Sequence, residues 1–209
     1  MSGLVITVAQ QKGGAGKTTL AVNLAVALLR EGRSVALLDT DPQGSLGRWF
    51  MQRREALGEA GLEFSTSSAW GVSYECEKLR KQVDVVIIDT PPKVDSDLRP
   101  ALREADLILV PVAASHVDLW ATEGVLDLAR REGKRPKIVL NRTKSKTRLG
   151  DQVRDAATQL EADLVEVTLG HRVVFAETLG QGLGVLEAPR KGAGHAEVTA
   201  LLHALLNLE

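Results

Sequence analysis

Residues 10–19 form a glycine-rich segment whose residue types suit the binding of phosphate groups. The segment follows an apolar run at residues 4–8 and precedes helical apolar spacing at residues 20–29, so we expect it to connect a strand to a helix. In such a loop the glycines let backbone N–H groups turn toward phosphate oxygens, and the helix N-terminus adds positive potential. The residues that we expect to contact a nucleotide here are Lys12, Gly13, Gly14, Ala15, Gly16, Lys17, Thr18 and Thr19.

Three carboxylates follow apolar runs elsewhere in the first half of the chain. Asp39 and Asp41 come after residues 34–38, and Asp89 comes directly after residues 85–88. A buried carboxylate without a cation is costly, and Mg²⁺ prefers oxygen ligands. Tandem carboxylates also occur in glycosidases, but here all three converge on one predicted magnesium site beside the phosphate loop.

The elements that must position these residues are visible as an alternation of strand-like and helix-like hydrophobic patterns. The expected strands are residues 4–8, 34–38, 83–88, 107–111, 138–140 and 164–167, with a weak candidate at 63–67. The expected helices are residues 20–29, 45–58, 73–82, 98–104, 117–132, 148–161 and 196–208. This pattern predicts an α/β fold, a mostly parallel twisted sheet with helices on both faces. With the phosphate loop at residues 10–19 after the first strand, it predicts a single-domain P-loop NTPase fold. Ligands of such sheets bind beyond the carboxyl ends of the strands, where the unusual residues lie.

The glycine-rich segment departs from the general phosphate-loop pattern, because Gln11 occupies the first glycine position and Lys12 precedes Gly13. The string Lys-Gly-Gly-x-Gly-Lys-Thr resembles the deviant Walker A box of the ParA/MinD family of P-loop ATPases. The resemblance extends to residues 39–44 and 89–92, and more loosely to 172–182 and 185–186. It implies Mg-dependent ATP hydrolysis by a homodimer that encloses ATP, with Lys12 as a catalytic residue that reaches the partner's phosphates. A second ammonium group there would offset charge on the γ-phosphate and the leaving group.

The same resemblance assigns roles to further side chains. Lys17 would reach the β- and γ-phosphates as a second catalytic residue, and Asp41 would be the third, orienting the attacking water. The implied magnesium site comprises Thr18, Asp39 and Asp89, with Asp39 acting directly or through water.

Asn141 and Arg142, at the end of the 138–140 strand, correspond to a region that contacts adenine in the family. A helix cap or turn explains Asn141 equally well.

Basic residues are concentrated between positions 130 and 148. The chain holds 26 Lys and Arg against 27 acids, for a net charge of −1, yet this window carries nine basic residues and one acid. The 138–140 strand divides this basic window, so its two halves, 130–137 and 142–148, should lie at opposite ends of the sheet. Only the second half can lie near the nucleotide, and its candidate DNA-binding residues are Arg142, Lys144, Lys146 and Arg148. A pair of solvated basic turns is the alternative interpretation.

The resemblance is greatest to the small ParA-type partition ATPases. It implies an ATP-bound homodimer that binds DNA nonspecifically and positions a plasmid, a chromosomal origin or a protein cargo. A ParB-like or other adaptor would stimulate hydrolysis. We expect one deviant Walker A ATPase domain over residues 1–209, without an N-terminal helix-turn-helix extension, in the cytoplasm and associated with the nucleoid.

Three other functions occur on the same fold. A MinD-like positioning ATPase lies on membranes through a basic amphipathic helix, but residues 196–208 contain no Lys or Arg, so we expect no membrane contact. An iron–sulfur reductase subunit needs two cluster thiolates, and the chain has only Cys76. A metabolic ATP-dependent ligase resembling dethiobiotin synthetase remains an alternative, which the basic window disfavours mildly.

Overall fold

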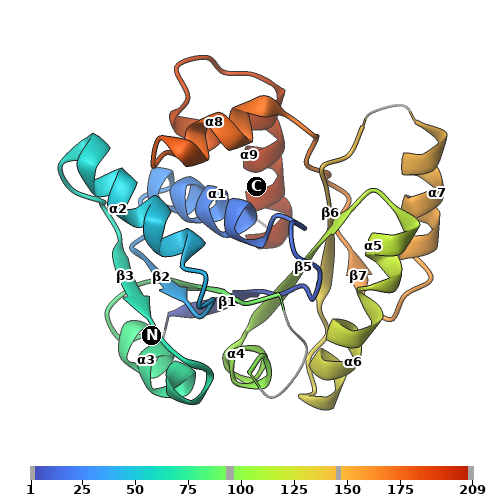
Figure 1. Cartoon of the computed structure of the whole chain (residues 1–209), viewed down its shortest axis with the longest axis horizontal. Helices are drawn as coiled ribbons and strands as arrows, with labels where there is room; N and C mark the ends of the chain where they lie inside the picture. Colours follow the sequence, from blue (N-terminus) through green and yellow to red (C-terminus); the bar gives the residue numbers. More distant parts are fainter. Residues whose placement is uncertain (1–2, 93–96, 145–146, 207–209) are drawn as a thin grey trace.

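The computed structural model describes residues 3–92, 97–144 and 147–206. In these ranges seven parallel strands form one sheet in the order β3-β2-β4-β1-β5-β6-β7 (Figure 1). The strands are β1 (Leu4–Val8), β2 (Val35–Asp39), β3 (Glu63–Thr66), β4 (Val85–Asp89), β5 (Leu107–Ala113), β6 (Lys137–Asn141) and β7 (Asp163–Leu164). The weak candidate strand at 63–67 is therefore confirmed as β3.

Helices cover both faces of this sheet, as predicted (Figure 1). One face carries α1 (Lys17–Arg30), α2 (Ser45–Leu57), α8 (Val173–Gly180), the short 3₁₀ turn η2 (Val185–Glu187) and α9 (Ala193–Leu206). The other carries α3 (Val72–Leu79), preceded by the 3₁₀ turn η1 (Ala69–Gly71), together with α4 (Arg99–Glu104), α5 (His116–Trp120), α6 (Glu123–Arg131) and α7 (Arg148–Ala157). In the described part of the chain, no helix is long and apolar enough to cross a membrane.

The central strands explain why the chain folds this way. Every residue of β2 and β4 is buried, because helices cover both faces of a parallel sheet and each strand must be apolar on both sides. The register pairs Asp89 of β4 with Asp39 of β2 on one side and with Val8 of β1 on the other. The carboxyl ends of these three strands therefore meet, and the loop after β1 lies beside both carboxylates.

The prediction of one continuous helix at 117–132 was wrong, because the structure has two helices there, α5 and α6. Between them, the buried Thr122 side chain donates to the Asp118 carbonyl (2.9 Å) and accepts from Gln10 Nε2 (3.1 Å). A Cβ atom at position 124 would collide with the amide of Gln11, so any larger residue there would displace that side chain. The helical pattern is interrupted because this corner packs against the phosphate loop.

Several element boundaries also differ from the predictions. The last helix begins at Ala193 rather than at 196, and its predicted end lies outside the described residues. Helix α8 was not predicted, and β7 has two residues rather than four.

Candidate nucleotide-binding site

The phosphate loop runs from the end of β1 to the start of α1. Gly16 has a φ of +92°, in the left-handed region that favours glycine, and α1 begins at the next residue, Lys17. The first N–H groups of this 14-residue helix have no partner within the helix and can bind an anion. Lys17 is only 7% exposed; burial lowers the pKa of its ammonium, while the carboxylates of Asp89 and Asp41 act in the opposite direction.

Asp89 lies directly beside Thr18 at the base of the site. The Thr18 hydroxyl donates to Asp89 Oδ2 at 2.6 Å. The other carboxylate oxygen, Oδ1, is buried and has no hydrogen-bond partner among the described residues. Burial raises the pKa of Asp89 to about 7, against the opposing effects of Thr18 and Lys17. This carboxylate is therefore placed where a nearby cation would stabilise it.

Asp39 and Asp41 form the second acidic part of the site. Asp39 accepts backbone N–H groups from Asp41 and Gly47, each at 3.0 Å, and so fixes the turn between β2 and α2. Burial raises the pKa of Asp39, although these two hydrogen bonds oppose the effect. Asp41 is more exposed and accepts the N–H of Gln43 at 2.9 Å. Asp39 thus positions the turn that carries Asp41.

These groups are suited to binding Mg²⁺ and a nucleoside triphosphate. The unpartnered Oδ1 of Asp89 and the neighbouring Thr18 hydroxyl are hard oxygen donors of the kind that Mg²⁺ prefers. Lys17 and the N-terminus of α1 supply positive charge for phosphate oxygens beside them. The donor set suits a magnesium–phosphate complex, in which the cation offsets the charge of both the carboxylate and the phosphates.

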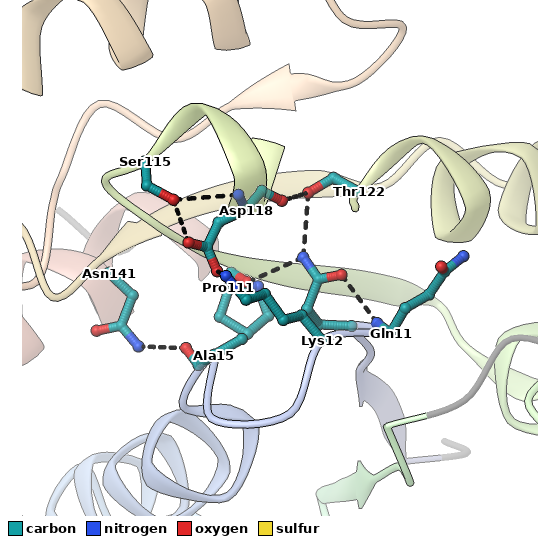
Figure 2. A network of polar contacts seen from close by, with 9 residues as sticks. Gln11, Lys12, Ala15, Pro111, Ser115, Asp118, Thr122 and Asn141 are labelled. Atoms are coloured by element: carbon teal, nitrogen blue, oxygen red, sulfur yellow. Dashed lines mark hydrogen bonds and ion pairs between the residues drawn. The ribbon is translucent and has the colours of Figure 1, made fainter. Parts of the chain in front are cut away.

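Lys12 is placed differently from Lys17. Its Nζ lies 2.8 Å from Asp118 Oδ1 in α5, and its side chain remains 39% exposed. Figure 2 shows the Lys12 side chain extending to Asp118, whose carboxylate also accepts the Ser115 hydroxyl. Ser115 caps α5 by accepting the N–H of Asp118 at 3.1 Å. The sequence did not identify Asp118 as a partner of Lys12, although the Ser-x-x-Asp spacing signals the start of a helix.

Gln10 is a supporting residue that sequence reasoning missed. It is buried, and its Nε2 donates to the Pro111 carbonyl (3.2 Å) and to Thr122 Oγ1 (3.1 Å). Its Oε1 accepts the N–H of Gln11 at 2.8 Å. Gln10 thus fixes the first turn of the phosphate loop to β5 and to the α5–α6 corner. No local signal reveals this role, because both acceptors of its Nε2 lie more than 100 residues away.

Asn141, the last residue of β6, and the following Arg142 lie on the other side of the loop. Asn141 Nδ2 donates to the carbonyl of Ala15 in the phosphate loop at 2.9 Å (Figure 2). Arg142 is exposed, with a φ of +51°. Beside them is a cavity of about 380 Å³, lined in part by Thr19, Gly170 and Phe175.

The two halves of the basic window lie at opposite ends of β6 and have different partners. In the first half, Arg130 pairs with Asp127 and Glu161, and Arg135 pairs with Asp163. In the second half, the exposed side chains of Arg142, Lys144 and Arg148 form no ion pair with any described residue. Lys146, also predicted to contact DNA, lies outside the described residues.

Comparison with known sequences shows similarity along nearly the whole chain. Residues 4–138 match the family model described as ATPase MipZ. The chain is 28% identical to Maintenance of carboxysome distribution protein A of Halothiobacillus neapolitanus, over 96% of this chain and 95% of that protein. It is 31% identical to the chromosome-partitioning ATPase Soj of Thermus thermophilus, over 97% of this chain and 92% of that protein.

The fold is also shared with solved structures. The septum site-determining protein MinD of Pyrococcus horikoshii, complexed with Mg-ADP, superposes with a TM-score of 0.79 at 18% identity. The match covers 97% of this chain and 95% of that chain. The chain therefore shares a known fold.

Proposed function

This chain belongs to the ParA/MinD family of P-loop ATPases, and from that premise we propose that it positions a cargo on DNA. The ATP-bound dimer binds DNA without sequence preference, and an adaptor stimulates hydrolysis and release. The cargo is a plasmid, a chromosomal origin or a protein assembly; relatives named for carboxysome distribution and chromosome partitioning support this range. The protein would act in the cytoplasm, on the nucleoid.

The chemistry of the proposal resides in the groups around the phosphate loop. Lys17 and the N-terminus of α1 bind and orient the phosphates, and Thr18 with Asp89 and Asp39 forms the magnesium site. Bound Mg²⁺ supplies charge compensation on the phosphates during hydrolysis. Asp41, on the turn that Asp39 fixes, orients the attacking water.

Dimerisation is supported by the surroundings of Lys12. Its ammonium pairs with Asp118 of α5, and its side chain remains 39% exposed, so a second copy can approach it at the surface. On α5 itself, Val117 and Trp120 are more than half exposed. Large exposed apolar side chains that adjoin a functional lysine are typical of a protein interface.

The observation that carries the DNA-binding proposal is the position of the basic segment made up of Arg142, Lys144 and Arg148, which form no ion pair with any described residue. This segment begins directly after Asn141, which contacts the phosphate loop. Cations of this kind at the edge of the sheet are available for the phosphate backbone of DNA. In α9, by contrast, Leu201, Leu202 and Leu205 are buried in the core, which favours DNA over a membrane surface as the partner.

The test is fluorescence anisotropy of a random-sequence DNA duplex titrated with protein. Titrations with ATP-Mg²⁺, with ADP and without nucleotide, at several salt concentrations, should show tight, salt-sensitive binding only with ATP. The double variant Lys144→Ala/Arg148→Ala should weaken binding and reduce the salt dependence by about two phosphate contacts. The matched control Arg130→Ala/Arg131→Ala removes the same charge at the opposite end of β6 and should bind as wild type. Equal losses in both variants, or no binding in any nucleotide state, would overturn the proposal.

A further inference from the structure

Asn141 is the last residue of β6, and its side chain packs against the phosphate loop with 6% of the residue exposed. Its Nδ2 donates to the Ala15 carbonyl at 2.9 Å, and its Oδ1 accepts the N–H of Arg142 at 2.8 Å. The reverse orientation of the amide would bring two acceptors together at Ala15 and two donors together at Arg142, so its partners determine its orientation. A Cβ atom at position 16 would collide with Nδ2, so the loop approaches this amide closely.

The bond to Ala15 affects the direction of the next N–H group. The peptide unit between Ala15 and Gly16 is planar and trans, so its C=O and N–H point in opposite directions. Because Asn141 holds the carbonyl on the β6 side, the N–H of Gly16 is turned away from β6, where the loop can offer it to a phosphate oxygen. A side chain that determines the orientation of this peptide unit determines part of the anion-binding geometry.

We propose that Asn141 is a positioning residue that holds the phosphate loop in its binding conformation, and that its contribution to nucleotide affinity is independent of the base. This rests on the proposed function only in requiring that the loop binds phosphates. It differs from a role in reading adenine, because the two bonds that the Asn141 amide makes are to the backbone of the phosphate loop and of Arg142.

The other end of Asn141 supports the basic segment. Arg142 is the one non-glycine residue with positive φ among those described, a conformation that is unfavourable without local support. Its N–H bonds to Asn141, and the following Thr143 is held by the Leu169 carbonyl at 3.0 Å and by a bridge to Gly170. Asn141 therefore joins the phosphate loop to the segment that carries Arg142 and Lys144.

The experiment measures the affinities of three phosphate ligands for the full chain. Mg²⁺ complexes of ATP, GTP and inorganic tripolyphosphate compete against a fluorescent ATP analogue, for wild type, Asn141→Ala and Asn141→Leu. The leucine variant fills the space that alanine leaves. Loss of one buried hydrogen bond predicts binding about 10-fold weaker in both variants, by the same factor for all three ligands.

Asn23→Ala is the matched control. The Asn23 amide is also buried; it donates to the Thr19 carbonyl at 2.8 Å and accepts the N–H of Val185 at 2.7 Å, away from the Ala15–Gly16 peptide. The Asn23→Ala variant should have a lower thermal unfolding midpoint, as the Asn141 variants do, yet it should bind all three ligands with wild-type affinity. A loss of affinity confined to ATP would show that Asn141 reads the base. Wild-type affinities in the Asn141 variants would show that Asn141 does not position the loop. Either result overturns the inference. A wild-type protein that bound none of the ligands would instead overturn the proposed function.

Discussion

Arg53 offers the clearest test of how the structure is stabilised, because its guanidinium is buried and each of its three nitrogens donates a hydrogen bond. It is 4% exposed and forms two 2.8 Å bonds to the carboxylate of Glu187. It also donates to the carbonyls of Ala60 (2.7 Å) and Gly182 (3.2 Å) and lies over the ring of Trp49. The Arg53 side chain thus connects α2 by hydrogen bonds to the segment between α8 and α9.

Replacing Arg53 by Met would keep most of the apolar stem and remove every one of these bonds. Glu187 would be left partly buried with the Gly184 N–H as its remaining partner, at 2.9 Å. Breaking a buried pair costs about 3–5 kcal/mol, and the 20% exposure of the Glu187 side chain places this case near about 3 kcal/mol. For a chain of this length, such a loss lowers the unfolding midpoint by about 6–12 °C.

The assay is urea and thermal unfolding of the nucleotide-free protein, followed by circular dichroism. The neighbouring Arg54 is exposed, and Arg54→Met should change the free energy of unfolding by no more than about 0.5 kcal/mol. A double-mutant cycle of Arg53→Met with Glu187→Gln should give a coupling energy of about 1–3 kcal/mol. Equal effects at positions 53 and 54, or a coupling energy near zero, would refute the reasoning.

Four further predictions concern pH and the nucleotide site. Burial opposes ionisation of Glu187, but the bonds from Arg53 and Gly184 outweigh it and hold the pKa of Glu187 below its usual value. The stability that the ionised Glu187 contributes should therefore be lost as pH falls through its folded-state pKa. Acid titration of unfolding should therefore destabilise wild type more than Glu187→Gln, and parallel curves would contradict this. Lys12→Ala should abolish the ATP-dependent dimer in sedimentation velocity while sparing much of the nucleotide binding by the monomer, and an unchanged dimer would exclude the trans role of Lys12. Asp41→Ala should trap the ATP dimer on DNA, whereas wild-type hydrolysis in that variant would remove Asp41 from the mechanism. Asp89→Asn should abolish Mg-dependent hydrolysis yet raise the unfolding midpoint of the nucleotide-free protein, because it removes a buried carboxylate with an unpartnered oxygen; a lowered midpoint would argue against that explanation.

The sequence by itself identified the phosphate loop and the strands around it. Periodicity shows which runs are apolar on both faces, and in a parallel sheet the ends of such runs meet at one edge. Asp39 and Asp89 could therefore be brought together from the sequence alone, and the register places them side by side. These inferences succeed because the signal is local: a glycine, a lysine or a carboxylate directly follows a recognisable strand.

Tertiary structure alone decided which polar groups are paired over long distances in the sequence. Gln10 with Thr122, Asn141 with Ala15 and Arg53 with Glu187 are each separated by more than 100 residues. Their contacts depend on strand order and helix packing rather than on neighbouring residues. The split of the predicted 117–132 helix has the same origin, since contacts with the phosphate loop override a helical pattern that is continuous in sequence.

The basic window shows the same division between composition and structure. Its charge was visible from the sequence, and so was Asp127, the partner of Arg130 one helical turn away. Nothing local, however, indicates that Arg135 has an acidic partner whereas Arg142 and Lys144 have none among the described residues. The distant partners Glu161 and Asp163 are brought close by the pairing of β6 with β7 and by the packing of α6 against the sheet. Charge is a property of composition, whereas its neutralisation depends on which segments the fold brings within about 4 Å of one another.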